Sequence, residues 1–345
     1  MRRIRRWVPL QRLREFSLVI ILIIVVLIFG NQIDNYYTPR TFNRISSTVA
    51  LITLVAVGQT MVVLTRNVDL SVGSVVGFTA YFVGRYVSKN EDMAPLMLAA
   101  LAMGIGAGMG LINGLLVAYG RIPAIVVTLG TMAIYRGLLV EYSDSKSVAT
   151  RELPDWIKEL PQESLFHYGE YELRALPAIA LAAVIIIFFL LLYSSFGRRL
   201  YAIGSSPEAA NLAGIRAPRM VTLAFTMCGA MAGLGGMLYL ARFGTITVDA
   251  ARGMELQVVA AVVVGGVNIL GGSGTVLGAM LGAILIGTIE QSLIRMNINE
   301  FWKDALLGLC IIIAVTVDRI LINQLTPWWS RTELQRMPEE PHAAV

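Results

Sequence analysis

The chain has 345 residues, of which 56% are hydrophobic and 15% are charged, and its mean hydropathy is +0.68. This apolar share is larger than a soluble domain of the same length can bury, so the composition excludes a soluble globular protein and indicates an integral membrane protein. The net charge of +5 comes from basic residues that flank the apolar runs. That placement is typical of membrane topology and disfavours a nucleic-acid surface.

The chain begins with an arginine-rich segment, MRRIRRWVPLQRLR, followed by an apolar run at 16–33. A secretory signal peptide has the same layout, but Asn31, Gln32, Ile33 and Asp34 offer no small-x-small cleavage pattern. We therefore expect a retained first helix, with residues 1–15 as a cytoplasmic segment because basic flanks stay inside.

Apolar runs near the roughly 17–25 residues needed to span a bilayer recur along the chain. Continuous blocks of Leu, Ile, Val and Ala favour helices over the alternating strands of a β-barrel. The expected spans lie at 16–33, 45–65, 93–119, 122–141, 175–195, 220–241 and 304–322.

Two further stretches are irregular. The segment 69–84 is short and contains three glycines, which indicates a short or broken helix, and the run 256–289 must hold two spans divided around 268–274. The prediction is an all-α polytopic membrane protein of about ten transmembrane helices with both termini in the cytoplasm. Its membrane domain covers 16–323, and 324–345 form a cytoplasmic tail.

Two charged segments separate the spans. The loop 142–174 has four basic and seven acidic residues, a net charge of −3, and is expected on the outer face. The segment 196–219, FGRRLYAIGSSPEAANLAGIRAPR, is expected in the cytoplasm because of its arginines.

Local chemistry predicts a short helix inside the segment 196–219. Ser205 or Ser206 can cap it, Pro207 suits its first position, Glu208 complements its positive end, and Gly214 can stop it. These features alone do not distinguish a docking element from a connector.

Polar residues within the apolar spans are costly in hydrocarbon and usually face a cavity or a partner. Arg136, Glu141, Glu255, Glu290 and Gln291 are such residues, and Glu255 and Glu290 are expected near the outer ends of their spans. The cluster from Arg66 to Ser71 is either a satisfied helix break or part of a solute path. The candidates for the solute path are Asn67, Asp69, Ser71, Asn113, Thr128 and Asn268.

The glycine-rich run 265–278 resembles a phosphate loop but lacks its lysine. Glycines at four-residue spacing instead predict close helix packing; the sets are Gly274/Gly278/Gly282, Gly104/Gly108, Gly106/Gly110 and Gly229/Gly233. The two histidines, His167 and His342, lie outside the spans, so we expect no catalytic residues, no metal site and no cofactor. Cys228 and Cys310 lie in apolar runs and indicate no disulfide.

Four segments resemble a known family: LTRNVDLSVGS (64–74), IPAIVVTLGTMAIYRGL (122–138), YAIGSSPEAANLAGI (201–215) and AAVVVGGVNILGGSGTVLGAMLGA (260–283). They are similar to the permease subunits of bacterial ABC sugar importers of the ribose, xylose, rhamnose and autoinducer-2 group. The resemblance covers about 45–320 with the motifs in the same order.

The resemblance implies a multi-pass protein of the bacterial inner membrane that pairs with a second, identical or related, permease subunit. Its other partners would be cytoplasmic ABC ATPase subunits and an extracytoplasmic solute-binding protein, and it would not hydrolyse ATP itself. The family's coupling helix matches Ser205 to Ile215, which implies contacts with the ATPase for Gly204, Glu208, Ala209, Ala210, Asn211 and Gly214.

The motifs IPAIVVTLGT, GMELQVVAAVVVGG and EFWKDALLG look most like the rhamnose and autoinducer-2 members, with ribose or another monosaccharide next. Glycine-rich broken helices would also permit a stand-alone channel or secondary transporter. An intramembrane enzyme is disfavoured, because the histidines leave little for general acid-base chemistry.

Overall fold

The computed structural model describes residues 8–298 apart from residue 170, together with scattered positions between 302 and 316. The expected last span at 304–322 and the tail at 324–345 therefore lie essentially outside the described residues, as does the start of the segment 1–15. Within the described part, most residues lie in helices.

The elements follow the predicted order. They are α1 Val8–Gln32, α2 Pro39–Leu64, α3 Val72–Val87, α4 Pro95–Ala118, α5 Ala124–Ser143, the 3-10 helix η2 Thr150–Glu152, α6 Asp155–Glu159, β1 Ser164–Tyr168, β2 Tyr171–Arg174, α7 Ala175–Tyr193, α8 Ser195–Ser205, α9 Pro207–Leu212, α10 Ala217–Phe243, α11 Met254–Val264 and α12 Val276–Arg295.

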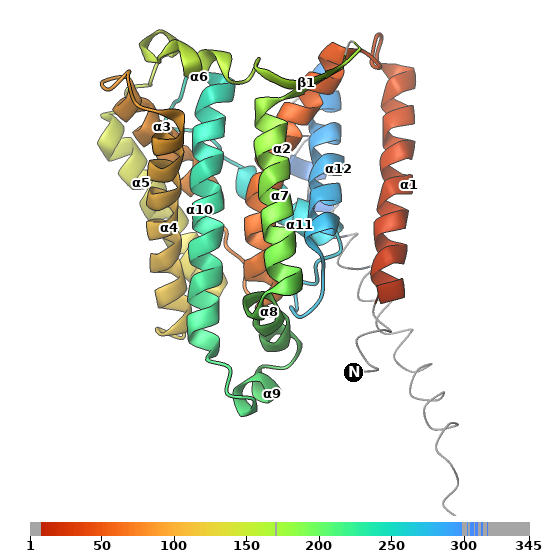
Figure 1. Cartoon of the computed structure of the whole chain (residues 1–345), viewed down its shortest axis with the longest axis vertical. Helices are drawn as coiled ribbons and strands as arrows, with labels where there is room; N and C mark the ends of the chain where they lie inside the picture. Colours follow the sequence, from red (N-terminus) through yellow and green to blue (C-terminus); the bar gives the residue numbers. More distant parts are fainter. Residues whose placement is uncertain are drawn as a thin grey trace, which may run out of the picture.

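The long helices stand side by side in one bundle (Figure 1), with α1 at its edge beside α12. Seven described helices are long and apolar enough to cross a membrane: α1 over Glu15–Gln32, and α2, α4, α5, α7, α10 and α12. The prediction of a polytopic, mainly helical membrane protein is confirmed.

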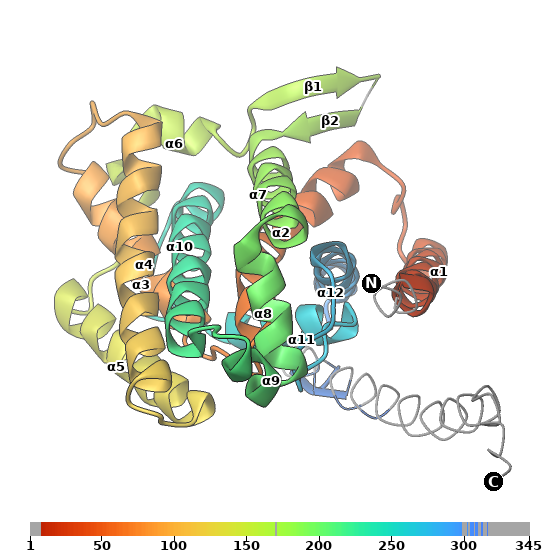
Figure 2. The same ribbon diagram turned by 60° about the horizontal axis from the view of Figure 1, so that its bottom comes forward.

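The two charged segments lie at opposite ends of this bundle. One end carries α9, and we call it the α9 end; the other carries α6 and the strands β1 and β2, and we call it the hairpin end (Figures 1 and 2). The expected loop 142–174 contains regular structure. Strand β1 pairs antiparallel with β2, and Val148 forms a β-bridge with Ile246, which follows α10.

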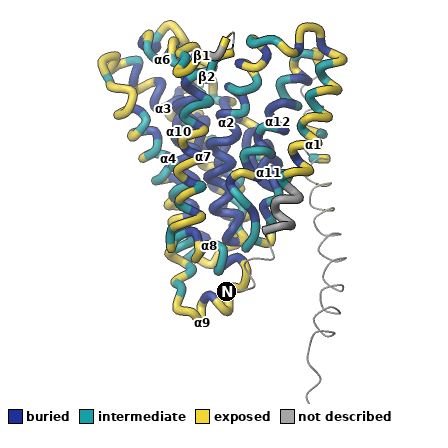
Figure 3. The backbone as a smooth tube through the Cα atoms, turned by 45° about the vertical axis from the view of Figure 1, so that its right-hand side comes forward, coloured by how far each residue is buried: buried dark blue, intermediate teal, exposed yellow. Residues whose placement is uncertain are grey.

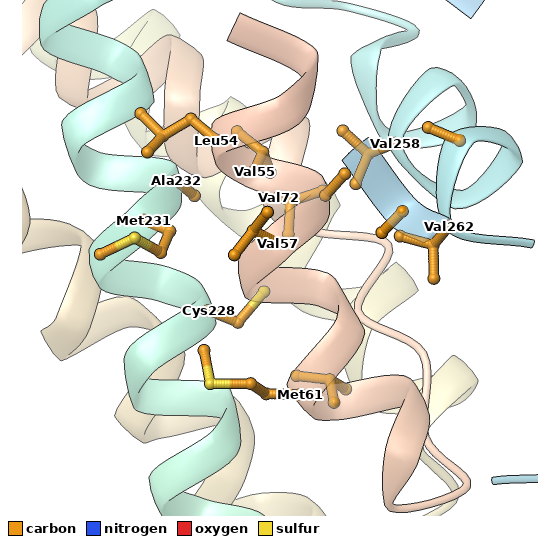
Figure 4. Packing of buried hydrophobic residues seen from close by; sticks show 14 of the residues in the cluster. Leu54, Val55, Val57, Met61, Val72, Cys228, Met231, Ala232, Val258 and Val262 are labelled. Carbon is orange, nitrogen blue, oxygen red and sulfur yellow. The ribbon is translucent and has the colours of Figure 1, made fainter. Parts of the chain in front are cut away.

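Helix α2 forms the centre of the bundle. Of its most apolar 18 residues, 94% are buried, which is the pattern of a helix surrounded by protein. Figure 3 shows it as a buried core element, and Figure 4 shows Leu54, Val57 and Met61 of α2 near Cys228 and Met231 of α10. It packs against α7, α10, α11 and α12, so movement of α2 would disturb most of the bundle.

Two helices inside the bundle, α3 and α11, are too short to cross the bilayer. With a rise of about 1.5 Å per residue, the 16 residues of α3 reach about 24 Å and the 11 residues of α11 about 16 Å, against an apolar core of about 30 Å. The predicted broken helix at 69–84 and the predicted division of 256–289 are both confirmed. The expectation that both halves of 256–289 would be full spans is wrong for α11, because residues 244–253 before it are not helical.

The first turns of these two short helices meet. A Cβ atom added to Gly73 of α3 would lie 2.1 Å from Oε2 of Glu255 in α11 and 2.9 Å from the carbonyl oxygen of Ala251. Glu255 is therefore partly buried inside the bundle at this meeting point, and the expected position near the outer end of a span is wrong for it.

The predicted glycine packing is confirmed between α4 and α10. A Cβ at Gly106 would lie 2.1 Å from the carbonyl oxygen of Gly229, and one at Gly233 would lie 2.1 Å from that of Ala102. Gly278 and Gly282 make similar approaches to the end of α11.

Three other glycines do not pack as predicted. A Cβ at Gly104 or Gly108 would meet nothing within 4 Å, because that side of α4 faces away from the rest of the described chain. Gly274 precedes α12 and has a φ of 136°, so it belongs to the turn rather than to a helix face.

A matched pair of alanine substitutions tests this packing. Gly106→Ala should lower the free energy of unfolding by about 1–3 kcal/mol, because the added methyl group meets the backbone of α10. Gly104→Ala should leave it unchanged or raise it by up to about 1 kcal/mol, because alanine favours helices and the space is open. Thermal unfolding of the purified protein in detergent measures both, and equal melting temperatures for the two variants would contradict this account.

Candidate functional site

The chain between α2 and α3 holds a buried carboxylate. Oδ1 of Asp69 accepts hydrogen bonds from the backbone N–H of Ser71 at 2.9 Å and from its hydroxyl at 2.6 Å. Asp69 is 1% exposed and Ser71 is fully buried. The turn they make starts α3 and satisfies backbone groups that have no water to bind inside a membrane.

Side chains from α4 and α5 complete a group around this turn. Nδ2 of Asn113 donates to the Ser71 hydroxyl at 2.8 Å and lies 3.5 Å from both carboxylate oxygens of Asp69. The Tyr135 hydroxyl donates to the carbonyl oxygen of Met109 at 2.9 Å and lies 3.5 Å from Oδ1 of Asn113. The hydroxyl of Thr128 lies 3.4 Å from the carbonyl oxygen of Val68.

We call Asp69, Ser71, Asn113, Thr128 and Tyr135 the polar cluster. Four of its members were candidates from the sequence. Tyr135 was missed because a tyrosine in an apolar helix also fits core packing, although its seven-residue spacing from Thr128 places both on one face of α5. No salt bridge involves Asp69 among the described residues, so neutral hydrogen-bond donors alone satisfy its carboxylate.

The other two candidates lie in different surroundings. Nδ2 of Asn67 donates to the carbonyl oxygen of Thr65 at 2.9 Å, a bond within its own loop. Asn268 shapes the turn between α11 and α12, where its Oδ1 accepts from the N–H of Leu270 at 2.9 Å. The structure therefore brings four of the six predicted solute-path residues together and leaves these two apart.

The non-helical segment 244–253 is supported by the half-buried side chain of Arg136. Nη1 of Arg136 donates to the carbonyl oxygens of Val248 at 3.2 Å and Ala250 at 2.7 Å. These bonds replace the helical hydrogen bonds that the segment lacks. Arg136 thus has a structural role. Among the described residues there is no group of three His, Cys, Asp or Glu side chains that could hold a metal ion.

The short helix α9 forms as its sequence predicts. The hydroxyl of Ser206 caps it by accepting from the N–H of Ala209 at 3.3 Å, Pro207 occupies its first turn, and Gly214 follows its end with a φ of 75°. It extends beyond the rest of the bundle at the α9 end (Figure 1).

The residues assigned to a coupling contact differ in exposure. Glu208, Ala209, Asn211 and Gly214 are exposed. Ala210 is only 3% exposed. Gly204 is buried so close to α2 that an added Cβ atom would lie 1.9 Å from the carbonyl oxygen of Leu64. Leu212, which sequence reasoning did not select, is 90% exposed at the end of α9. In the sequence, the only sign of this was a leucine within the charged segment 196–219.

A double-mutant cycle tests the polar cluster. Ser71→Ala and Asn113→Ala should each lower the free energy of unfolding by about 1–3 kcal/mol, because each leaves a buried polar group without its main partner. The double variant should lose less than the sum, since both substitutions remove the same hydrogen bond. Strictly additive losses in detergent unfolding would contradict this arrangement.

Comparison with known proteins agrees with the motifs. Residues 41–315 match the family described as "Branched-chain amino acid transport system / permease component". No solved structure matches the chain.

Among the similar relatives is the autoinducer 2 import system permease protein LsrC of Yersinia enterocolitica, 35% identical over 90% of this chain and 83% of the relative. The proteins of the same name from Yersinia pseudotuberculosis and Yersinia pestis are 35% and 34% identical, each over 90% of this chain and 86% of the relative. The motifs, the multi-pass helical bundle and these matches show that the chain belongs to this family of transport permeases and is a permease of the ABC sugar importer type.

Proposed function

We propose that this chain is the membrane subunit of an ATP-driven importer for autoinducer-2 or a closely related sugar-like solute. Its similarity to autoinducer-2 import permeases over 90% of its length carries this proposal. The solute would come from an extracytoplasmic binding protein and move inward when two cytoplasmic ATPase subunits hydrolyse ATP. A second permease subunit, identical or related, completes the complex.

We propose that the α9 end faces the cytoplasm of a bacterial cell and the hairpin end faces outward. The segment 196–219, with its four arginines and one glutamate, supports this orientation, because basic segments are retained inside. The acidic segment 142–174, with a net charge of −3, lies at the opposite end of the bundle.

In this orientation α9 is the coupling helix. Glu208, Ala209, Asn211 and Gly214 are exposed for contact with an ATPase, and Leu212 adds an exposed apolar side chain at the end of α9. Gly204 and Ala210 support the contact from inside, by allowing α8 and α9 to pack closely against the protein.

The polar cluster is the proposed contact region for the solute. Hydroxyl and amide groups match the hydroxyl groups of a neutral, sugar-like molecule, and Asp69 adds a strong acceptor. In the described conformation these side chains are buried and bond one another or nearby backbone carbonyls, so the solute would replace those hydrogen bonds as the helices separate.

Transport into vesicles tests the solute. Vesicles containing the permease, the ATPase and the binding protein should accumulate labelled autoinducer-2 only with ATP, and excess unlabelled autoinducer-2 should compete better than rhamnose or ribose. Stronger competition by rhamnose would assign the transporter to that sugar instead. Accumulation without the ATPase would favour a secondary transporter or channel.

Substitution of Leu212 tests the coupling helix. Leu212→Asp should weaken copurification of the ATPase and reduce ATP-dependent transport about tenfold or more, because burying an unpaired carboxylate in the interface is costly. Leu165→Asp is the matched control for copurification, since Leu165 is 68% exposed and lies in β1 at the hairpin end, away from α9. If both variants bind and transport like the original protein, α9 is only a connector.

A further inference from the structure

Two helix ends and one turn meet at one point near the α9 end. They are the end of α2, the end of α8 and the turn between α11 and α12. The N–H of Gly272 donates to the carbonyl oxygen of Leu64 at 3.1 Å, and the hydroxyl of Ser205 donates to the carbonyl oxygen of Gly272 at 3.3 Å. The hydroxyl of Tyr201 donates to the carbonyl oxygen of Gly274 at 2.9 Å. We call this contact region the junction.

Arg66 links α2 to α8 within the junction. Its Nε donates to the carbonyl oxygen of Gly204 at 2.7 Å, and its Nη2 donates to that of Ser205 at 3.1 Å. These are the last two residues of α8, whose carbonyl groups have no partner in the helix. The guanidinium therefore satisfies the end of α8 and places a positive charge where the helix dipole is negative.

The junction leaves little room for its parts to slide. A Cβ at Gly204 would lie 1.9 Å from the carbonyl oxygen of Leu64 and 2.3 Å from the nitrogen of Gly272. A Cβ at Gly271 would lie 2.5 Å from Cγ of Arg66. Because backbone meets backbone here, movement of α8 must carry the end of α2 with it.

The backbone of Arg66 forms the turn that ends α2. The N–H of Arg66 bonds the carbonyl oxygen of Val63, and the N–H of Asn67 bonds that of Val62 at 3.4 Å, which is the Schellman pattern for ending a helix. Glycine usually occupies the position of Arg66, whose φ is 67°. An arginine at this position costs backbone strain, which its two bonds to α8 offset.

We infer that Arg66 is a positioning residue that passes movement of α9 to the chain break containing Asp69 and Ser71. Arg66 holds the end of α8, directly before α9, and lies three residues before Asp69. Movement of α9 is therefore transmitted to the polar cluster through a short, non-helical segment rather than through the whole bundle. This inference rests on the proposed coupling of α9 to an ATPase.

Arg66→Gly tests the inference, because glycine keeps the Schellman turn and removes only the side chain. In the assembled transporter, this variant should retain the copurifying ATPase and its ATP hydrolysis, while solute transported per ATP falls about tenfold, a typical size for coupling between linked sites. Arg66→Lys keeps the charge but cannot form both bonds with the geometry of a guanidinium, so it should show a smaller loss.

Arg121→Gly is the matched control. Arg121 also has a positive φ, of 55°, and lies in the turn between α4 and α5, but its side chain makes no hydrogen bond or ion pair with the described residues. This variant should transport and hydrolyse ATP like the original protein.

The outcomes separate the inference from the proposed function. If the original complex transports with ATP and Arg66→Gly keeps its transport per ATP within about twofold, the inference is wrong. Loss of the ATPase from Arg66→Gly would also overturn it, because the arginine would then only shape the docking surface. If the original complex transports without an ATPase, the proposed function itself fails. Should Arg66→Gly not accumulate in the membrane, unchanged transport per ATP in Arg66→Lys overturns the inference.

Discussion

Backbone hydrogen bonding without water is the constraint on which this structure depends. A membrane protein can interrupt a helix only where other groups satisfy the freed N–H and C=O groups. The described chain has three such interruptions within its bundle, at 65–71, at 244–253 and between α11 and α12. Asp69, Arg136 and Asn268 each bond the backbone of one of them.

Burial of α2 and close packing by glycine give these interruptions a firm frame. Helices α4 and α10 touch backbone to backbone through Gly106, Gly110, Gly229 and Gly233, which brings dispersion contacts where lipid offers no hydrophobic driving force. The polar cluster lies between this pair and α2, α3 and α5. These contacts bring the hydrogen-bonding groups of the polar cluster together in the described conformation.

Sequence reasoning predicted the order of the helices, the broken segment before α3 and the cap of α9, because each depends on local chemistry or on apolar length. It placed Asp69, Ser71, Asn113 and Thr128 in one group of candidates by their cost in hydrocarbon. It could not separate them from Asn67 and Asn268, since the partner of an asparagine depends on which helices become neighbours. It also could not foresee that Gly104 faces outward while Gly106 faces α10, because both belong to four-residue repeats.

Helix α9 has only six residues, well below the length at which an isolated helix persists in water. Its shape depends on the serine cap before it and on Ala210, which is buried against the protein. A chain whose helices had not yet assembled would present this segment as a flexible peptide with no fixed surface. A partner that binds only the folded form of α9 would therefore bind only fully folded molecules. It would not bind copies of the chain whose helices have not yet assembled.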